Sequence, residues 1–220
     1  MLDAHRAYLD AGRDRGRRAD LRNADLAGLN LAGANLRRAR MSRAFLDGAD
    51  LRRADLAKAN LIGASLRGAC LAEAELSGAR ISGADALTTD FAAARLANAD
   101  MEFAILANAI LTGACLRDAD LSGANLDGAE LRVADLRGAN LRGAGLQGAR
   151  LDGANLQGTR LGGAFLRGAY VRLAKLDDAD LSGADLRGTE GLTRAQIDAA
   201  GRDNDTKLPP ELVEGGSHGE

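Results

Sequence analysis

The residue types that most often catalyse reactions or bind metals are few in this 220-residue sequence. The two histidines, His5 and His218, lie near opposite ends, and the two cysteines, Cys70 and Cys115, do not belong to a Cys-x-x-Cys pair. Metal sites need several such ligands at short, regular spacing. The sequence therefore predicts no metal site. A structural disulfide is one alternative for the cysteines, but we favour free thiols in a reducing compartment.

Acidic side chains are plentiful, but their surroundings predict solubilising charge. Asp118 and Asp120, for example, lie in a regular repeat without the concave pocket that shifts the pKa of a general acid or base. Glycine-rich phrases such as GGAFLRGA are repeat corners with no helix after them, so they do not predict a phosphate-binding loop. We therefore expect no catalytic residue, no cofactor and no enzymatic activity.

Most of the sequence is a five-residue repeat, and any site would have to be built on the structure that this repeat forms. Leucine occupies 28 of the 34 unit centres from Leu21 to Leu186, and Gly follows two residues later in 19 units. Alanine stands two residues before most centres, and Asp or Asn often stands one before. The other six centres are Met41, Ile81, Ala86, Phe91, Met101 and Val171. The period is unbroken over about three-quarters of the chain.

Neither regular structure fits a spacing of five. Leucines five apart would spiral around an α-helix, and they would alternate between the faces of one long strand. Within a unit, however, Ala-x-Leu places both apolar residues on one side, and the next two residues must turn the chain. Glycine stands where a type II turn requires a positive φ. The pattern predicts an all-β repeat solenoid of short strands and corners, with leucine and alanine facing its axis.

The Ala-(Asp/Asn)-Leu-x-x unit, as in LSGANLDGAE at residues 121–130, resembles the motif of the pentapeptide repeat proteins. This resemblance covers residues 19–188. It implies four units per coil, a right-handed quadrilateral β-helix of about 8 coils, and a rod that binds other macromolecules. Residues twenty apart would then stack, which predicts internal ladders. One ladder comprises Leu36, Leu56, Leu76, Leu96, Leu116, Leu136, Leu156 and Leu176.

The two ends differ in composition from the repeat. We expect an N-terminal cap with a short helix at 1–18, the repeat β-helix at 19–190, a C-terminal capping helix at 191–201 and a polar, partly disordered tail at 202–220. Thr193 and Gln196 form a T-x-x-Q capping box, and Gly201 suits the C-terminal end of that helix. The resemblance adds that C-terminal elements can also form a dimer contact, and both roles stay open.

Charge and hydropathy limit the partners. Twenty-nine basic and 31 acidic residues give a net charge of −2, so we expect no direct binding of nucleic acid. No segment has the length of a signal-peptide core or of a membrane span. We therefore expect a soluble, cytoplasmic, bacterial-type protein that forms a monomer or a weak homodimer.

Two functions compete. The first is a rigid scaffold for an unknown protein partner, with a contact patch at four outward apolar residues: Leu87, Phe103, Ile105 and Ile110. The alternative, taken from one branch of the resembled family, is a DNA mimic that binds type II topoisomerases such as gyrase and alters the action of their inhibitors. Residues 19–190 contain 22 acidic and 21 basic residues. That balance disfavours a mimic of an anionic polymer.

Overall fold

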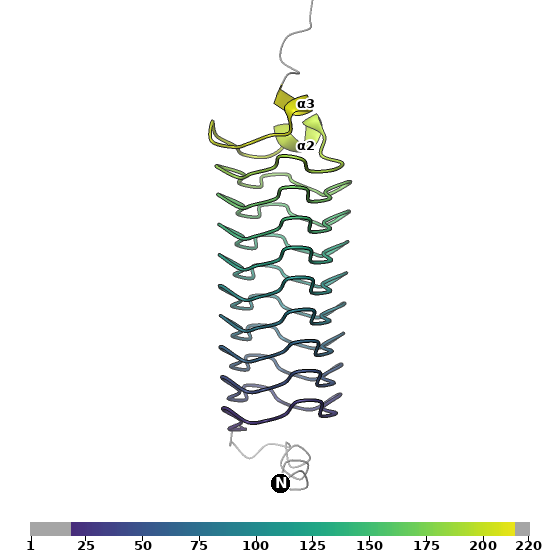
Figure 1. Cartoon of the computed structure of the whole chain (residues 1–220), viewed down its shortest axis with the longest axis vertical. Helices are drawn as coiled ribbons and strands as arrows, with labels where there is room; N and C mark the ends of the chain where they lie inside the picture. The colour runs from purple at the N-terminus through teal and green to yellow at the C-terminus, as the bar shows by residue number, and fades with distance from the viewer. Residues whose placement is uncertain (1–18, 214–220) are drawn as a thin grey trace, which may run out of the picture.

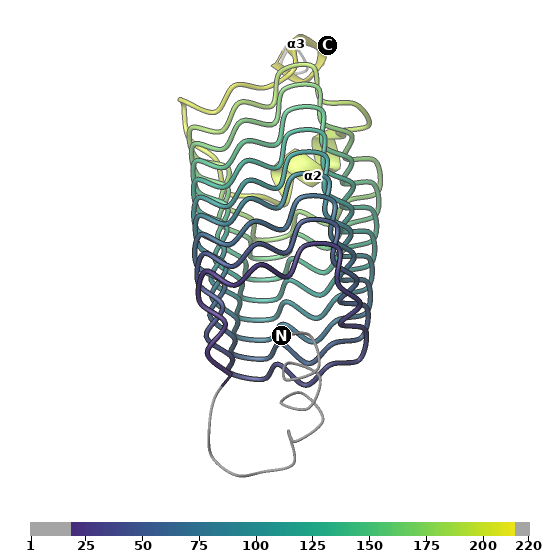
Figure 2. The same cartoon turned by 60° about the horizontal axis from the view of Figure 1, so that its bottom comes forward.

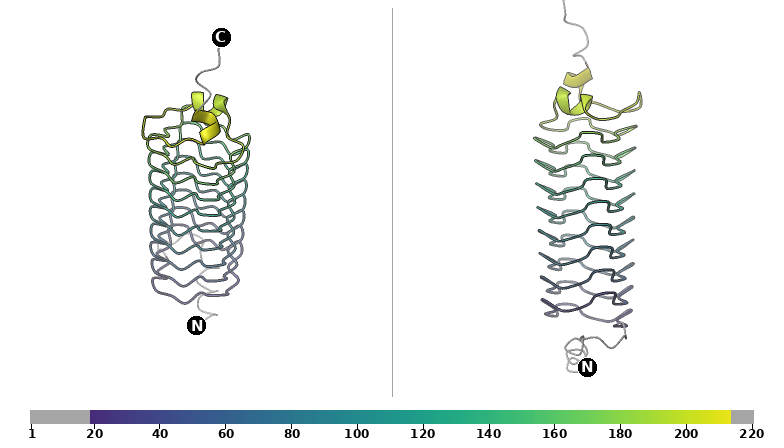
Figure 3. Two further views of the ribbon diagram at one scale, coloured as in Figure 1. Left: turned by 45° about the horizontal axis from the view of Figure 1, so that its top comes forward. Right: turned by 180° about the vertical axis from the view of Figure 1, so that it is seen from behind.

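The computed structural model describes residues 19–213, and these residues form one elongated coiled rod (Figure 1). Parallel β-bridges join residues twenty positions apart, from Asp20↔Arg40 to Tyr170↔Glu190. The chain therefore completes one coil every 20 residues, as the four-unit coil predicted. Successive coils stack in register along the rod (Figures 2 and 3). The cap predicted for residues 1–18 lies outside the described residues.

Each five-residue unit consists of one bridged residue followed by a corner. At the first corner, the backbone N–H of Ala24 donates to the carbonyl oxygen of Leu21 over 3.1 Å. The position two after each unit centre has a positive φ, whether it is glycine, as at Gly28 (65°), or another residue, as at Val133 (51°). A positive φ at this position is what a type II turn requires. The predicted corner geometry is therefore confirmed.

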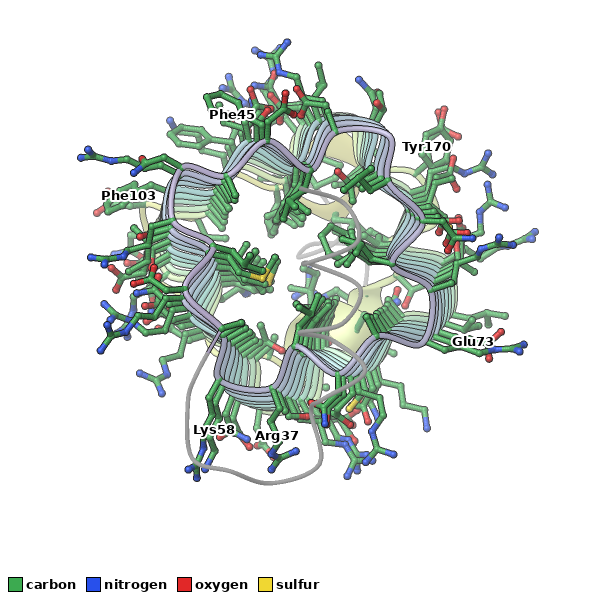
Figure 4. All side chains as sticks on the ribbon, turned by 90° about the horizontal axis from the view of Figure 1, so that it is seen from below. Arg37, Phe45, Lys58, Glu73, Phe103 and Tyr170 are labelled. Atoms are coloured by element: carbon green, nitrogen blue, oxygen red, sulfur yellow. The ribbon has the colours of Figure 1, made fainter. Side chains whose placement is uncertain are left out.

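The predicted internal ladders are also present. Leu36 and Leu176 are 1% and 3% exposed, and the leucines between them in the same column are equally buried. The inward side chains converge on the axis of a four-sided cross-section (Figure 4). Phe91 is fully buried in the coil where Ala86 takes the place of a leucine. Since burying one leucine contributes roughly 1.5–3 kcal/mol, these ladders are the main stabilising element of the rod.

A short helix covers the C-terminal end. Helix α2 (Arg194–Asp198) begins with the predicted capping box, in which Thr193 and Gln196 bond each other's backbone. The side-chain Nε2 of Gln196 also donates to the carbonyl oxygens of Val171 and Ala174, at 3.0 and 2.8 Å. The assignment of Gly201 to the helix end is wrong. The helix is capped by Ala199 in the αR conformation, and Gly201 forms a β-bridge with Asp180 instead.

Part of the polar stretch after α2 also belongs to the stack. Lys207 bridges Asp185, and the hydroxyl of Thr206 donates to the carbonyl oxygen of Leu181 over 3.0 Å. Helix α3 (Pro210–Val213) then ends the described chain. These contacts satisfy backbone groups of the last coil that would otherwise be an open sheet edge. Within residues 19–213, no helix is long and apolar enough to span a bilayer.

Candidate protein-contact surface

Where the outward residue before a unit centre is Asp or Asn, its side chain commonly bonds the backbone of the following corner. The side-chain oxygens of Asp25, Asn30 and Asp55 accept hydrogen bonds from the N–H group two residues later, at 3.2, 3.1 and 3.0 Å. Short polar side chains commonly stabilise turns in this way. The prediction that these Asp and Asn residues bond corner backbone groups is confirmed, so many surface carboxylates have a structural role.

Many of the remaining carboxylate contacts are ion pairs with arginine. Arg52 Nη2 lies 2.6 Å from Asp50 Oδ2, and hydrogen bonding from this arginine lowers the pKa of Asp50 to about 2. Asp135 is bonded by Arg137 and by Arg117 of the preceding coil, and these contacts hold its pKa well below the usual range. Acids that stay ionised far below neutral pH are poor general acids at pH 7.

The cysteines offer little chemistry in this arrangement. Cys70 and Cys115 are both free thiols and half-buried. The thiol of Cys70 is 3.7 Å from Asp90 Oδ2, to which it donates a weak hydrogen bond. In the part of the chain that the structure describes, no three His, Cys, Asp or Glu side chains come close enough to hold a metal ion.

Three members of the predicted contact patch are exposed. Phe103 is 69% exposed, Ile105 42% and Ile110 40%. Phe103 projects outward at one corner of the cross-section (Figure 4). Ile105 follows in the same coil, and Ile110 lies beyond the next corner. Leu87 differs from expectation, because it is half-buried. It lies in the preceding coil next to Ala107, whose carbonyl oxygen accepts from the N–H of Thr88.

The ring of Phe103 lies against the backbone of Gly123 in the next coil. A Cβ atom built on Gly123 would fall 2.5 Å from Phe103 Cε1. Phe103 itself has a φ of 55°, in the left-handed region that most corners fill with glycine. The phenyl ring of Phe103 can therefore lie against this coil because Gly123 has no side chain.

Other large apolar side chains are exposed too, and two of them stand at corner positions like that of Phe103. Val133 is 64% exposed and Leu173 80%, and both stand at corner positions with positive φ. They belong to one column of the rod and are separated by Gly153, on which a Cβ atom would lie 3.3 Å from Val133 Cγ1. Their signal in the sequence was a large apolar residue at a position that is usually glycine.

Comparison with known families gives a match along most of the rod. A family model described as pentapeptide repeats, in 8 copies, matches residues 17–53, 49–85, 89–123, 119–158 and 154–189. No curated protein sequence matches the chain.

Several solved structures are similar. One is HetL, a pentapeptide repeat protein involved in heterocyst differentiation regulation from the cyanobacterium Nostoc sp. strain PCC 7120. It is 31% identical, with 99% of both chains covered and a TM-score of 0.48. Another is a trypsin-treated form of QnrB1, a plasmid-mediated fluoroquinolone resistance protein. It is 20% identical, with 80% of this chain and 90% of that chain covered and a TM-score of 0.67. The likeness to QnrB1 shows a shared fold.

Proposed function

Because the chain belongs to the pentapeptide repeat family, we propose that it is a non-enzymatic, rigid rod that binds a partner protein through its side. We also propose that the rod is a right-handed quadrilateral β-helix of about 8 coils. The observation that carries the function is the exposure of Phe103, Ile105 and Ile110 on a surface made mostly of small and charged residues. Large apolar side chains carry most of the binding energy of protein interfaces.

The rod presents these side chains on a preorganised backbone. Ile105 is bridged to Asp85 in the preceding coil and to Asn125 in the next, and Ile110 is bridged to Asp90 and Glu130 in the same way. Behind them, Leu106 and Leu111 are fully buried. A surface that does not have to become ordered on binding loses less conformational entropy. This supports a scaffold whose contact residues are fixed in advance.

The alternative, a DNA mimic that binds gyrase, has less support. Arginine side chains are interspersed among the carboxylates and paired with them, as in Arg52–Asp50, Arg67–Asp85 and Arg187–Asp185, each 2.6 Å apart. A mimic must present continuous negative charge, because duplex DNA carries one charge per ~1.7 Å. The chain shares a fold with QnrB1, but a shared fold does not indicate a shared binding partner.

The test is a pull-down from extract of the native cells with the intact rod as bait, beside a second bait with Phe103→Ser and Ile105→Ser. We expect a partner that binds the wild-type rod and is lost from the double variant. Thermal stability should change by no more than about 1 kcal/mol, because both side chains face outward. A partner retained by the variant rejects the contact patch, and a large loss of stability places these side chains in the core.

A further inference from the structure

The contact patch lies within a surface of uniform charge sign that continues around one corner of the rod onto the adjoining side, and this surface is called the central face below. This central face consists of residues 82–90, 102–110 and 122–130, which stack through the bridges Asp85↔Ile105↔Asn125 and Asp90↔Ile110↔Glu130. It contains no lysine or arginine and five acidic residues: Asp85, Asp90, Glu102, Asp127 and Glu130. Basic residues return in the same register on either side, with Arg67 in 62–70 and Arg142 and Arg150 in 142–150.

Two of the five carboxylates are neutralised by arginines that lie outside the central face. Arg67 pairs with Asp85 and Arg132 with Glu130, each over 2.6 Å. The other three, Asp90, Glu102 and Asp127, form no ion pair with any residue in the 19–213 range.

These three carboxylates surround the apolar side chains. Glu102 precedes Phe103 in the chain, and Asp90 is bridged to Ile110. Asp127 lies in the next coil, beside the corner between Ile105 and Ile110, because its carbonyl oxygen accepts a hydrogen bond from the N–H of Asn108 in that corner. Apolar anchors and unpaired negative charges therefore share one surface.

We propose that the central face binds a segment of a partner protein that combines apolar side chains with lysine or arginine. This inference rests on the proposed scaffold function and adds the chemistry of the partner. A purely apolar partner would cover Asp90, Glu102 and Asp127 without compensation, which is costly. An acidic protein, a nucleic acid or an anionic lipid surface would be repelled by them. Cationic groups would pair with all three while apolar groups cover Phe103, Ile105 and Ile110.

The partner's chemistry can be read from a random peptide library displayed on phage and selected on the intact rod. We expect the enriched peptides to carry a net positive charge together with apolar residues. Their affinity should fall as ionic strength rises, because exposed charge pairs are screened by salt. No enrichment, or enrichment of neutral or acidic peptides, would overturn the proposal.

Two variants locate the binding. Phe103→Gly with Ile105→Ser removes the apolar anchors, and glycine is the usual residue at the corner that Phe103 occupies. Asp90→Asn with Asp127→Asn removes two charges but keeps the oxygens that accept from the backbone of Ala92 and Gln147. We expect each pair to weaken peptide binding at least tenfold. Wild-type affinity in either variant would contradict the assignment.

The matched control is Val133→Gly with Leu173→Gly, which removes two other exposed apolar residues from a different column. It should leave peptide affinity unchanged, and an equal loss would show non-specific adhesion and overturn the proposal. Concentration-dependent dimerisation in light scattering that disappears in the central-face variants would identify a second copy as the occupant, which also overturns it. If a partner from the native extract binds all these variants, the scaffold function stands and the central face is rejected.

Discussion

Phe103 and Gly123 form a pair across two neighbouring coils, in which the phenyl ring occupies the space that a side chain at Gly123 would need. Gly123→Ala should therefore destabilise the rod in two ways, through its positive φ of 63° and through contact with the ring. We expect a loss of about 1–3 kcal/mol, which thermal or urea unfolding would measure.

A double-mutant cycle separates these two effects. Phe103→Gly should remove the steric part of the cost of Gly123→Ala and leave the backbone part. If Gly123→Ala costs the same with and without the phenyl ring, then the ring does not lie against this glycine.

The inside and outside of the rod can be distinguished with one charge placed at two positions. Leu96→Asp puts an unpaired carboxylate at a fully buried position of a leucine ladder, so it should prevent folding or cost several kcal/mol. Asn98→Asp adds the same charge two residues later, at an exposed corner with a φ of 56° that Asp tolerates. We expect a change within about 0.5 kcal/mol for Asn98→Asp. Circular dichroism melts would show equal damage if the assigned orientation were wrong.

The paired carboxylates predict a loss of stability in acid. The pKa of Asp50 and of Asp185 is lowered to about 2 by Arg52 and Arg187, and Asp135 is shifted in the same direction. A folded-state pKa below the unfolded value of about 3.9 gives stability that is complete above pH ~4–5. It is lost as pH falls toward 2. Melting temperatures recorded from pH 7 to pH 2 should therefore stay level and then fall below pH ~4.

Asp135→Asn provides the matched test of this acid sensitivity. It should lower stability at pH 7, by up to about 1 kcal/mol, and should reduce the fall between pH 4 and pH 2. The control Asp178→Asn changes an exposed carboxylate that has no ion-pair partner in the described part of the chain, so its pH profile should follow the wild type. A wild-type pH profile for Asp135→Asn would mean that the Arg117 and Arg137 contacts do not stabilise the fold.

The charge distribution predicts no action on gyrase. The purified protein should neither inhibit supercoiling nor protect gyrase from a quinolone at low-micromolar concentration, since arginines interrupt its negative surface. A supercoiling assay checks this. Inhibition in that range that weakens with added salt would favour the DNA-mimic alternative over the basic protein segment proposed for the central face.

The regular part of the fold was predictable because each five-residue unit shows which of its residues face inward and where the chain turns. A leucine every fifth position identifies the buried ladders, and the glycine two residues later identifies each corner. The four-sided coil needed the family resemblance, since the period does not state how many units close a turn. Gly201 was misplaced because its partner, Asp180, is distant in sequence, and no local pattern near α2 indicates a bridge.

The contact patch was predictable only in part. Phe103, Ile105 and Ile110 could be placed outside by counting from the leucines. The half-buried state of Leu87 depends on how neighbouring coils cover it, and such cover varies from corner to corner. Asp90, Glu102 and Asp127 lack an ion-pair partner because the neighbouring arginines extend toward other carboxylates. This depends on arginine rotamers, for which the sequence gives no rule. Val133 and Leu173 were detectable as exceptions to glycine at the corner.

The twenty-residue register makes the length of the rod and the direction of its faces separately adjustable. Removing one whole coil beyond the central face, for example residues 141–160, would shorten the rod by about 4.8 Å while every remaining residue kept its column. Removing a single five-residue unit would instead turn everything beyond the deletion by a quarter revolution relative to the central face. Insertions of twenty residues, or of a multiple of twenty, therefore change only the length of the rod. Insertions of other multiples of five also change the direction in which the surfaces beyond them point.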